Sequence, residues 1–196
     1  MWALALIPAA LVIFVAVLVI RAAAFKPKKQ PELDSYEVSF DKDKAVSDLA
    51  ELVRCKTVSY RDPSLEDDAE FEKLIALLPS LYPNVNKVCE FTRLPDRGLL
   101  FRWAGKSADA PAVMMAHYDV VPVNEDLWDT PAFEGIIKDG FIIGRGTLDT
   151  KVTFSGMLFA ANHLISEGFV PENDIYFAFS GGEEVNGLGA DRIVDY

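Results

Sequence analysis

Three short segments of the sequence carry side chains that can bind a metal ion or move a proton. The first holds His117 and Asp119, and residues two apart in extended backbone project to the same face. A carboxylate so placed can orient an imidazole whose other nitrogen binds a metal. Taken alone, the same pair could be a surface histidine beside a solvated aspartate.

The second and third segments each follow a predicted strand. Asp149 lies in a glycine-rich loop, where backbone freedom can hold a carboxylate at a fixed point or where the residue could cap the next helix. Lys151 could pair with a nearby carboxylate, and no catalytic pattern surrounds it. Glu183 and Glu184 follow the apolar run 175–179. Adjacent glutamates there are costly unless a cation compensates them, although a solvated acidic loop is the alternative.

The elements that position these segments can be predicted from hydrophobic periodicity. Apolar residues recur at helical spacing from Asp41 to Arg54 and from Glu66 to Leu78, and Pro79 is expected to end the second helix. A long helix is predicted from Lys151 to Glu167, and another from Gly187 onward. Short β-prone runs are predicted to form strands at residues 85–91, 99–103, 112–116, 133–137, 141–143 and 175–179.

This order of elements predicts an α/β domain with a mixed, largely parallel sheet flanked by helices. Asp139-Gly140, between two of the runs, is a hairpin signal. All three chemical segments follow predicted strands, and open α/β sheets place their sites outside the carboxyl ends of the strands. One imidazole with several carboxylates suits zinc, with manganese or cobalt as alternatives.

In sequence order, these motifs resemble those of the two-zinc metallopeptidases, which include aminoacylase, carboxypeptidase G, acetylornithine deacetylase and succinyl-diaminopimelate desuccinylase. The stretches His117–Val123 (HYDVVPV) and Gly144–Asp149 (GRGTLD) are most similar to the carboxypeptidase S and N-acyl-amino-acid hydrolase branch. The resemblance covers residues 41–196, and His117, Asp149 and Glu183 are spaced 32 and 34 positions apart.

The resemblance implies a zinc-exopeptidase-like catalytic domain that holds two zinc ions. It implies that His117 ligates one metal, that Asp149 bridges both and that Glu184 ligates the second. Two catalytic residues are implied: Glu183 as the general base on the water between the metals, and Asp119 as the residue that braces the site. The implied substrates are dipeptides or N-acyl amino acids, hydrolysed at the amide bond.

Members of this family also have a later acidic ligand, a late histidine and an inserted lid domain, whereas this chain ends 12 residues after Glu184. We therefore expect residues 41–196 to be the N-terminal part of a catalytic domain, with the lid domain and the C-terminal part absent. On this view the fragment is inactive and its full-length parent is a hydrolase. The alternative is a membrane-tethered binding scaffold with the same fold.

The N-terminus has a different character. The first 20 residues are apolar except for Pro8, and a helix of about twenty residues spans the hydrocarbon core of a bilayer, about 30 Å thick. Residues 1–24 are predicted to be a single transmembrane anchor or an uncleaved signal. Residues 22–24 are small enough for signal cleavage, but no basic residue precedes the apolar run. Residues 25–40, with two prolines, are predicted to be a linker.

Charge and cysteine content give further expectations about the partners of the protein, its thiols and its side of the membrane. The net charge of −11 argues against nucleic acid as a partner. Cys55 and Cys89 are predicted to be two buried thiols rather than a disulfide. Basic residues after the apolar run favour a cytoplasmic body, whereas relatives in the resembling branch also work in a lumen or outside the cell. These basic residues are Arg21, Lys26, Lys28 and Lys29. The oligomeric state is left open by the sequence.

Overall fold

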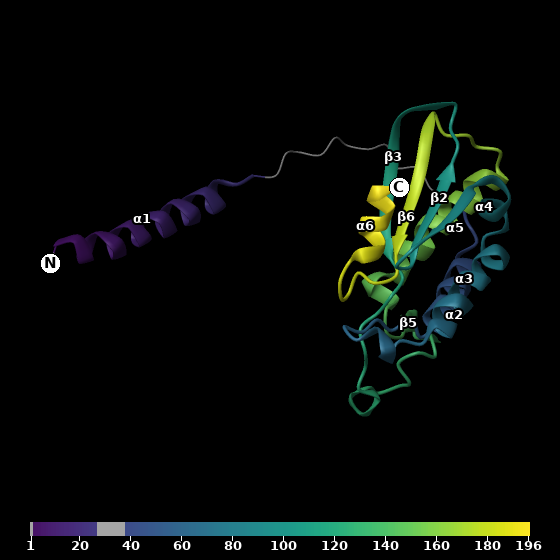
Figure 1. Cartoon of the computed structure of the whole chain (residues 1–196), viewed down its shortest axis with the longest axis horizontal. Coiled ribbons are helices and arrows are strands. Elements are labelled where there is room, and N and C mark those ends of the chain that lie inside the picture. The colour runs from purple at the N-terminus through teal and green to yellow at the C-terminus, as the bar shows by residue number, and fades with distance from the viewer. Residues whose placement is uncertain (1, 27–37) are drawn as a thin grey trace. The chain divides into compact units, whose positions relative to one another are not determined.

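The structure is a computed structural model that describes residues 2–26 and 38–196 (Figure 1). The chain divides into two compact units, and the boundary between them along the sequence lies between Ser39 and Phe40. Residues 27–37 of the predicted linker lie outside the described residues.

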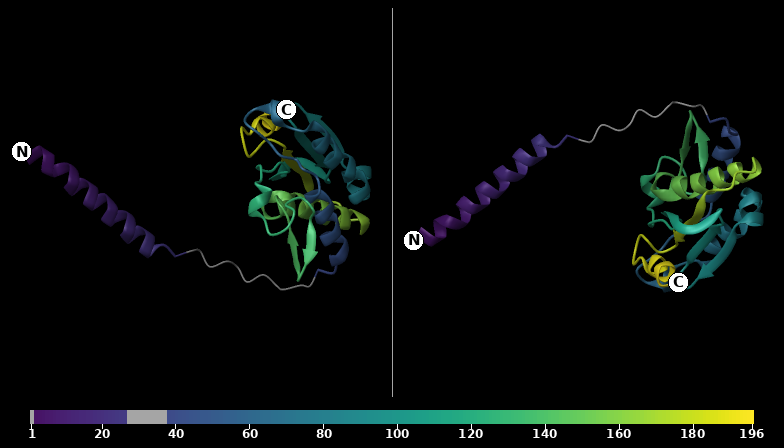
Figure 2. Two further views of the ribbon diagram at one scale, coloured as in Figure 1. Left: turned by 90° about the horizontal axis from the view of Figure 1, so that it is seen from below. Right: turned by 90° about the horizontal axis from the view of Figure 1, so that it is seen from above.

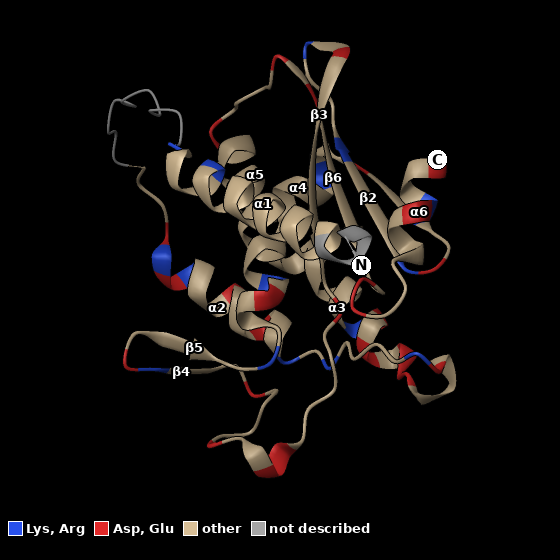
Figure 3. Cartoon of the chain, turned by 90° about the vertical axis from the view of Figure 1, so that its left-hand side faces the viewer, with Lys and Arg blue, Asp and Glu red and all other residues tan. Residues whose placement is uncertain are grey.

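The first unit contains one helix, α1 (Trp2–Ala24). Its 23 residues give a length of about 35 Å. Arg21 in the last turn is its only charged residue. The ribbon of this helix is accordingly drawn mostly in the tan of uncharged residues in Figure 3. The part from Leu6 to Ala24 is long and apolar enough to cross a membrane, a property that a signal sequence near an N-terminus shares.

The second unit opens with two amphipathic helices. Helix α2 (Lys42–Val53) begins where the Asp41 carboxylate accepts the backbone N–H of Lys44 at 2.9 Å, as the sequence predicts. Helix α3 (Asp68–Leu81) continues past Pro79, so the predicted end at Leu78 is wrong. A proline in the last turn removes a single N–H from the helix, and the N–H of Tyr82 still donates to the Leu78 carbonyl at 2.8 Å.

The strand predicted at residues 85–91 is also wrong over most of its length. A short helix, α4 (Pro83–Val88), occupies it, and strand β1 (Glu90–Leu94) follows. Pro83 at the first helical position presets the helical φ angle. The N–H of Asn84 donates to the Asn162 side chain at 2.8 Å, and Val85 is buried. These tertiary contacts outweigh the β propensity of the segment.

A four-stranded sheet forms the centre of the second unit, in the order β1-β2-β6-β3. Its other strands are β2 (Gly98–Trp103), β3 (Ser107–His117) and β6 (Asn173–Ser180). The mixed α/β sheet is confirmed, but the expectation that it is largely parallel is wrong in the part of the chain that the structure describes. Only β3 and β6 run parallel there. A three-residue turn joins β1 to β2, and a connection that short requires antiparallel strands.

Helices cover both faces of the sheet (Figures 1 and 2). On one face, alternate residues of β2 and β6 pack on helices α2 to α4 and on α5 (Val152–Ser166), and the buried apolar residues of this layer include Leu52, Leu74, Leu99, Phe101, Phe154, Leu158, Phe177 and Phe179. On the other face lies α6 (Leu188–Asp195), whose Ile193 approaches Gly98 so closely that a Cβ there would lie 3.3 Å from it. Two single turns, η1 (Pro63–Leu65) and η2 (Glu125–Leu127), lie in the connections between these elements.

A hairpin forms a second, two-stranded sheet that is separate from the four-stranded one. Strands β4 (Ile136–Lys138) and β5 (Phe141–Ile143) pair across Asp139-Gly140, both of which have positive φ, so the predicted hairpin is confirmed. Its first strand begins at Ile136 rather than at Phe133, because Phe133 is buried in a small cluster with Val120 and Ala132. Cys55 and Cys89 are both free and buried, as predicted.

The core predicts a stability effect. We expect Leu74→Ala to lower the free energy of unfolding by about 2–5 kcal/mol, because Leu74 is fully buried between helix and sheet and truncation leaves a cavity. Leu65→Ala is the matched control, since Leu65 is 62% exposed and should cost less than about 0.5 kcal/mol. Urea unfolding of the full chain in detergent measures both values. Equal effects would contradict this assignment of the core.

Candidate metal centre

The candidate site lies where two neighbouring strands end. Strands β3 and β6 are parallel, and their last residues, His117 and Ser180, are register partners. The chain leaving β3 stays close to β6, because the N–H of Tyr118 donates to the Ser180 carbonyl at 3.0 Å. The loops after the two strands therefore leave the sheet at the same edge, where sites in α/β sheets form.

Three of the predicted residues converge at this edge. One ligand atom each from His117, Asp149 and Glu184 lies within 4.8 Å of the other two. The His117 Nε2 atom is 3.1 Å from an Asp149 carboxylate oxygen. Asp149 does not cap helix α5, which begins without a side-chain cap, so the helix-cap alternative is wrong. The structure therefore brings these three residues together.

Asp119 lies beneath the cluster and is fully buried. Its carboxylate accepts the backbone N–H groups of Glu183 at 3.2 Å and of Glu184 at 3.1 Å. It also accepts the hydroxyl of Ser59 at 2.6 Å and lies 3.4 Å from His117 Nδ1. Burial would raise the pKa of this carboxyl, but the hydrogen bonds from His117, Ser59 and the Glu184 N–H outweigh burial and lower it. Asp119 is therefore an ionised carboxylate that joins three segments.

The charge around His117 favours a cation. Burial would lower the pKa of this imidazole, but its hydrogen bonds to Asp119 and the negative charges of Asp119 and Glu183 raise it to about 9. Its Nε2 faces Asp149 at 3.1 Å and Glu183 at 3.6 Å. Burial first, and then the charge of Asp149, raises the pKa of Glu184. A positive ion bound among these groups would be attracted by the same carboxylates.

The loop that carries Asp149 is the irregular turn η3 (Thr147–Lys151), which precedes α5. Gly146 starts it with a φ of 81°, and a Cβ at that position would clash with Val120. Lys151 ends it and is fully buried, with a pKa that burial lowers to about 8. The Lys151 ammonium donates to backbone carbonyls rather than to a carboxylate, so the carboxylate pairing considered from the sequence is wrong.

Sequence reasoning missed one residue that touches the site. Ser59 is 1% exposed, and its hydroxyl donates to Asp119 at 2.6 Å, across 60 positions of sequence. It lies in a short segment after α2 that has neither periodicity nor a motif. Its polar character next to Val58 gives no signal of burial, because serine is mostly a surface residue.

These donors fit a divalent transition metal. An imidazole nitrogen and carboxylate oxygens are zinc ligands, and they bind at about 2.0–2.2 Å from the ion. Donors within 4.8 Å of one another can share one such ion after small side-chain movements. The braced Nδ1 side of His117 leaves Nε2 aimed at the carboxylates, which is the arrangement that metal-binding histidines have. The cluster opens into a hollow of about 310 Å³, lined by Met115, Ala116, His117, Asp149, Thr150, Ala178, Ser180, Glu183, Ala190 and Ile193.

Comparison with known sequences gives relatives over most of the chain. It is 35% identical over 143 residues to a probable carboxypeptidase S-like protein 2 of Dictyostelium discoideum, a match covering 71% of this chain and 28% of that protein. It is 32% identical over 164 residues to carboxypeptidase S of Saccharomyces cerevisiae, covering 78% and 28%. It is 31% identical over 196 residues to the N-fatty-acyl-amino acid synthase/hydrolase PM20D1 of Xenopus tropicalis, covering 94% and 38%. The chain thus spans about a third of the length of these relatives.

Solved structures share the fold. Human carnosine dipeptidase 1 superimposes with a TM-score of 0.65 at 17% identity, over 78% of this chain and 35% of that one. The dipeptidase Dug1p of Saccharomyces cerevisiae gives a TM-score of 0.60 at 21% identity, over 78% and 35%. Residues 113–196, which include His117, Asp149, Glu183 and Glu184, match the model of Peptidase family M20/M25/M40. Taken with the relatives above, this match assigns the segment 113–196 of the chain to peptidase family M20/M25/M40.

Proposed function

We propose that this chain contributes the first half of a dinuclear zinc centre that hydrolyses an amide bond in dipeptides or N-acyl amino acids. The observation that carries the proposal is the convergence of His117, Asp149 and Glu184, with the Glu183 carboxylate 3.6 Å from the same imidazole. The substrate class is supported by the names of the relatives, which are carboxypeptidases and an N-fatty-acyl-amino acid synthase/hydrolase. Manganese or cobalt could replace zinc with the same donors.

In this proposal His117, Asp149 and Glu184 would hold the metal, and Asp149 would be shared by the two ions. When bound, a pair of divalent cations supplies a more acidic water and positive charge beside the scissile carbonyl. Glu183 takes the proton from the attacking water and delivers it to the leaving amine. Its side chain is 56% exposed, so substrate and water can reach it, and its backbone is fixed by Asp119.

Three ligating side chains are too few for two zinc ions that each take four ligands. Within residues 2–26 and 38–196, His117, Asp149 and Glu184 form the one cluster of three or more such donors. We therefore propose that further polypeptide, of the kind that makes the relatives longer, supplies the remaining ligands. The 196-residue chain by itself is then a metal-binding but inactive fragment.

The N-terminal helix is proposed to be a single-pass anchor rather than a cleaved signal. Support comes from the apolar stretch Leu6–Ala24 and from the absence of a basic residue before it. Arg21 lies near the end of the stretch and Lys26 follows it, which favours a cytoplasmic body, although the sequence resemblance also allows a lumenal or extracellular one.

Zinc binding tests the metal centre. We expect the full chain in detergent micelles to bind zinc and His117→Ala to weaken binding at least about 100-fold, because the imidazole is the only nitrogen donor in the cluster. His163→Ala is the matched control, since His163 lies in α5 and contacts only Glu167 among the acids. Isothermal titration calorimetry measures the affinities. Equal loss in both variants would exclude the proposed centre.

Hydrolysis tests the reaction. We expect the full-length gene product to hydrolyse members of a panel of N-acyl amino acids and dipeptides, with loss of activity in chelator. Glu183→Gln should lower kcat about 100-fold or more while zinc stays bound, because the amide cannot accept a proton. Activity that survives Glu183→Gln would exclude it as the base. Rapid chelator-sensitive turnover by the 196-residue chain alone would refute the claim that this part is inactive.

Membrane fractionation tests the anchor. After expression in eukaryotic cells, we expect the chain to stay in the membrane pellet through alkaline carbonate extraction and to keep residues 2–24, as read by mass spectrometry of its N-terminal peptide. An anchor of this length is held by apolar transfer alone. A mature N-terminus just after Ala24, with the protein in the soluble fraction, would instead identify a cleaved signal.

A further inference from the structure

The segment between α2 and η1 is the part of the molecule that touches both sides of the candidate metal centre without contributing a ligand. We call residues Cys55–Ser59 the strap. It begins at the carboxyl end of α2, and all of its residues except Lys56 and Val58 are buried. Nothing in the proposed chemistry uses it.

At one end, the strap is hydrogen-bonded to the residues that directly follow His117, the last residue of β3. The N–H of Val120 donates to the Thr57 carbonyl at 2.9 Å, and the N–H of Ser59 donates to the Val120 carbonyl at 3.1 Å. The Thr57 hydroxyl donates to the Tyr118 carbonyl at 2.5 Å. The Ser59 hydroxyl then donates to the Asp119 carboxylate, which orients His117 and holds the two glutamates. This end therefore controls the imidazole side of the centre.

At the other end, the strap is fixed to the loop that carries Asp149. The Lys151 ammonium donates to the Cys55 carbonyl at 2.7 Å and to the Leu52 carbonyl, in the last turn of α2, at 2.9 Å. Carbonyls at a helix carboxyl end carry partial negative charge, so they stabilise a buried ammonium that has no carboxylate partner. Lys151 follows Asp149 by two residues, and its own N–H donates to the Gly146 carbonyl at 2.9 Å. This end therefore controls the carboxylate side.

We propose that Ser59 and Lys151 are positioning residues, which use the strap as a common support to set the separation between the His117 imidazole and the Asp149 carboxylate. The inference rests on the proposed metal centre. Two ligands on loops that belong to different strands have no direct covalent constraint on their distance. The strap supplies a non-covalent constraint, because a single buried backbone segment is hydrogen-bonded to both parts of the chain.

Cobalt(II) and zinc binding to the full chain in detergent tests the inference, with variants Ser59→Ala and Lys151→Met. We expect each to weaken zinc binding about 10- to 100-fold and to alter the visible spectrum of bound cobalt, because the remaining donors no longer match the ion. In the double variant, the combined loss should be smaller than the product of the two losses, since both act through one segment.

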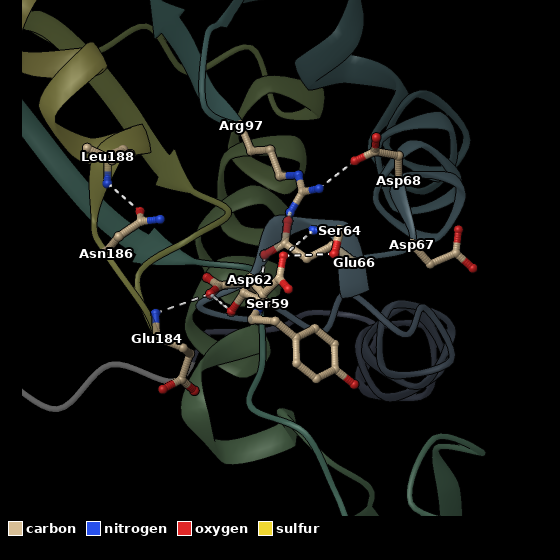
Figure 4. Close-up of polar contacts among 12 residues, drawn as sticks. Ser59, Asp62, Ser64, Glu66, Asp67, Asp68, Arg97, Glu184, Asn186 and Leu188 are labelled. Carbon is tan, nitrogen blue, oxygen red and sulfur yellow. Dashed lines mark hydrogen bonds and ion pairs between the residues drawn. The ribbon is translucent and has the colours of Figure 1, made fainter.

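Matched controls separate positioning from general damage. Ser64→Ala removes a serine–aspartate hydrogen bond of similar length, 2.8 Å to Asp62, at an exposed position (Figure 4). Lys73→Met removes a lysine that donates to the Arg54 carbonyl at 2.9 Å from the surface. Both should leave zinc affinity and the cobalt spectrum unchanged. Near-UV circular dichroism checks that each variant is folded, and Ser59→Ala, the smaller change, carries the test if Lys151→Met is unfolded.

The outcomes separate the inference from the function on which it rests. If the unmodified chain binds neither metal, the metal centre itself is wrong and the positioning role falls with it. If the unmodified chain binds and the folded Ser59→Ala variant binds with the same affinity and the same cobalt spectrum, the centre stands and the strap does not position it. Losses that multiply in the double variant would also overturn the common support.

Discussion

A carboxylate that solvent does not reach must find its hydrogen bonds inside the protein, and Asp119 finds them on three segments. The acceptor atoms of this side chain receive the Ser59 hydroxyl, the backbone N–H groups of Glu183 and Glu184, and the edge of His117. Charge-assisted hydrogen bonds of this kind are the strong ones, and an ion buried without them costs several kcal/mol. The Asp119 carboxylate therefore fixes the positions of His117, Glu183 and Glu184 relative to one another. Asp149 is held by other contacts.

This constraint explains how acidic side chains can be held close together. Asp149, Glu183 and Glu184 all face the same imidazole edge, and their mutual repulsion disfavours the cluster when it holds no cation. Movement of the loop that carries Glu183 and Glu184 cannot relieve this repulsion, because the backbone N–H groups of both residues donate to the Asp119 carboxylate. The fold thus carries an electrostatic cost at this edge, which bound cations would offset. Binding proteins and enzymes both store strain of this kind at their sites.

The sequence could predict those parts of the molecule that depend on local pattern. The hairpin at Asp139-Gly140 and the strands predicted at residues 112–116 and 175–179 follow from apolar runs that stop at polar residues, and the observed strands end one residue later than predicted, at His117 and Ser180. Helix α4 could not be predicted, because the β propensity of Val85 is outweighed by the burial of its side chain in the core. The direction of the sheet was mispredicted for a similar reason: the short turn before β2 fixes an antiparallel pair, whatever the pattern inside each strand.

The strap shows why residues that support metal ligands, without binding the metal themselves, cannot be recognised from a single sequence. Lys151 contacts the end of α2 across nearly a hundred positions, and Ser59 contacts Asp119 across 60. Neither contact leaves a spacing rule, because each joins an isolated residue to backbone or to a side chain in another element. A lysine two residues from a candidate ligand is expected to face solvent or a carboxylate, yet here its ammonium donates to two backbone carbonyls, one in the last turn of α2 and one just beyond it. Such residues become recognisable only when burial and partners are known together, since burial without a carboxylate partner is what marks the ammonium as part of the framework.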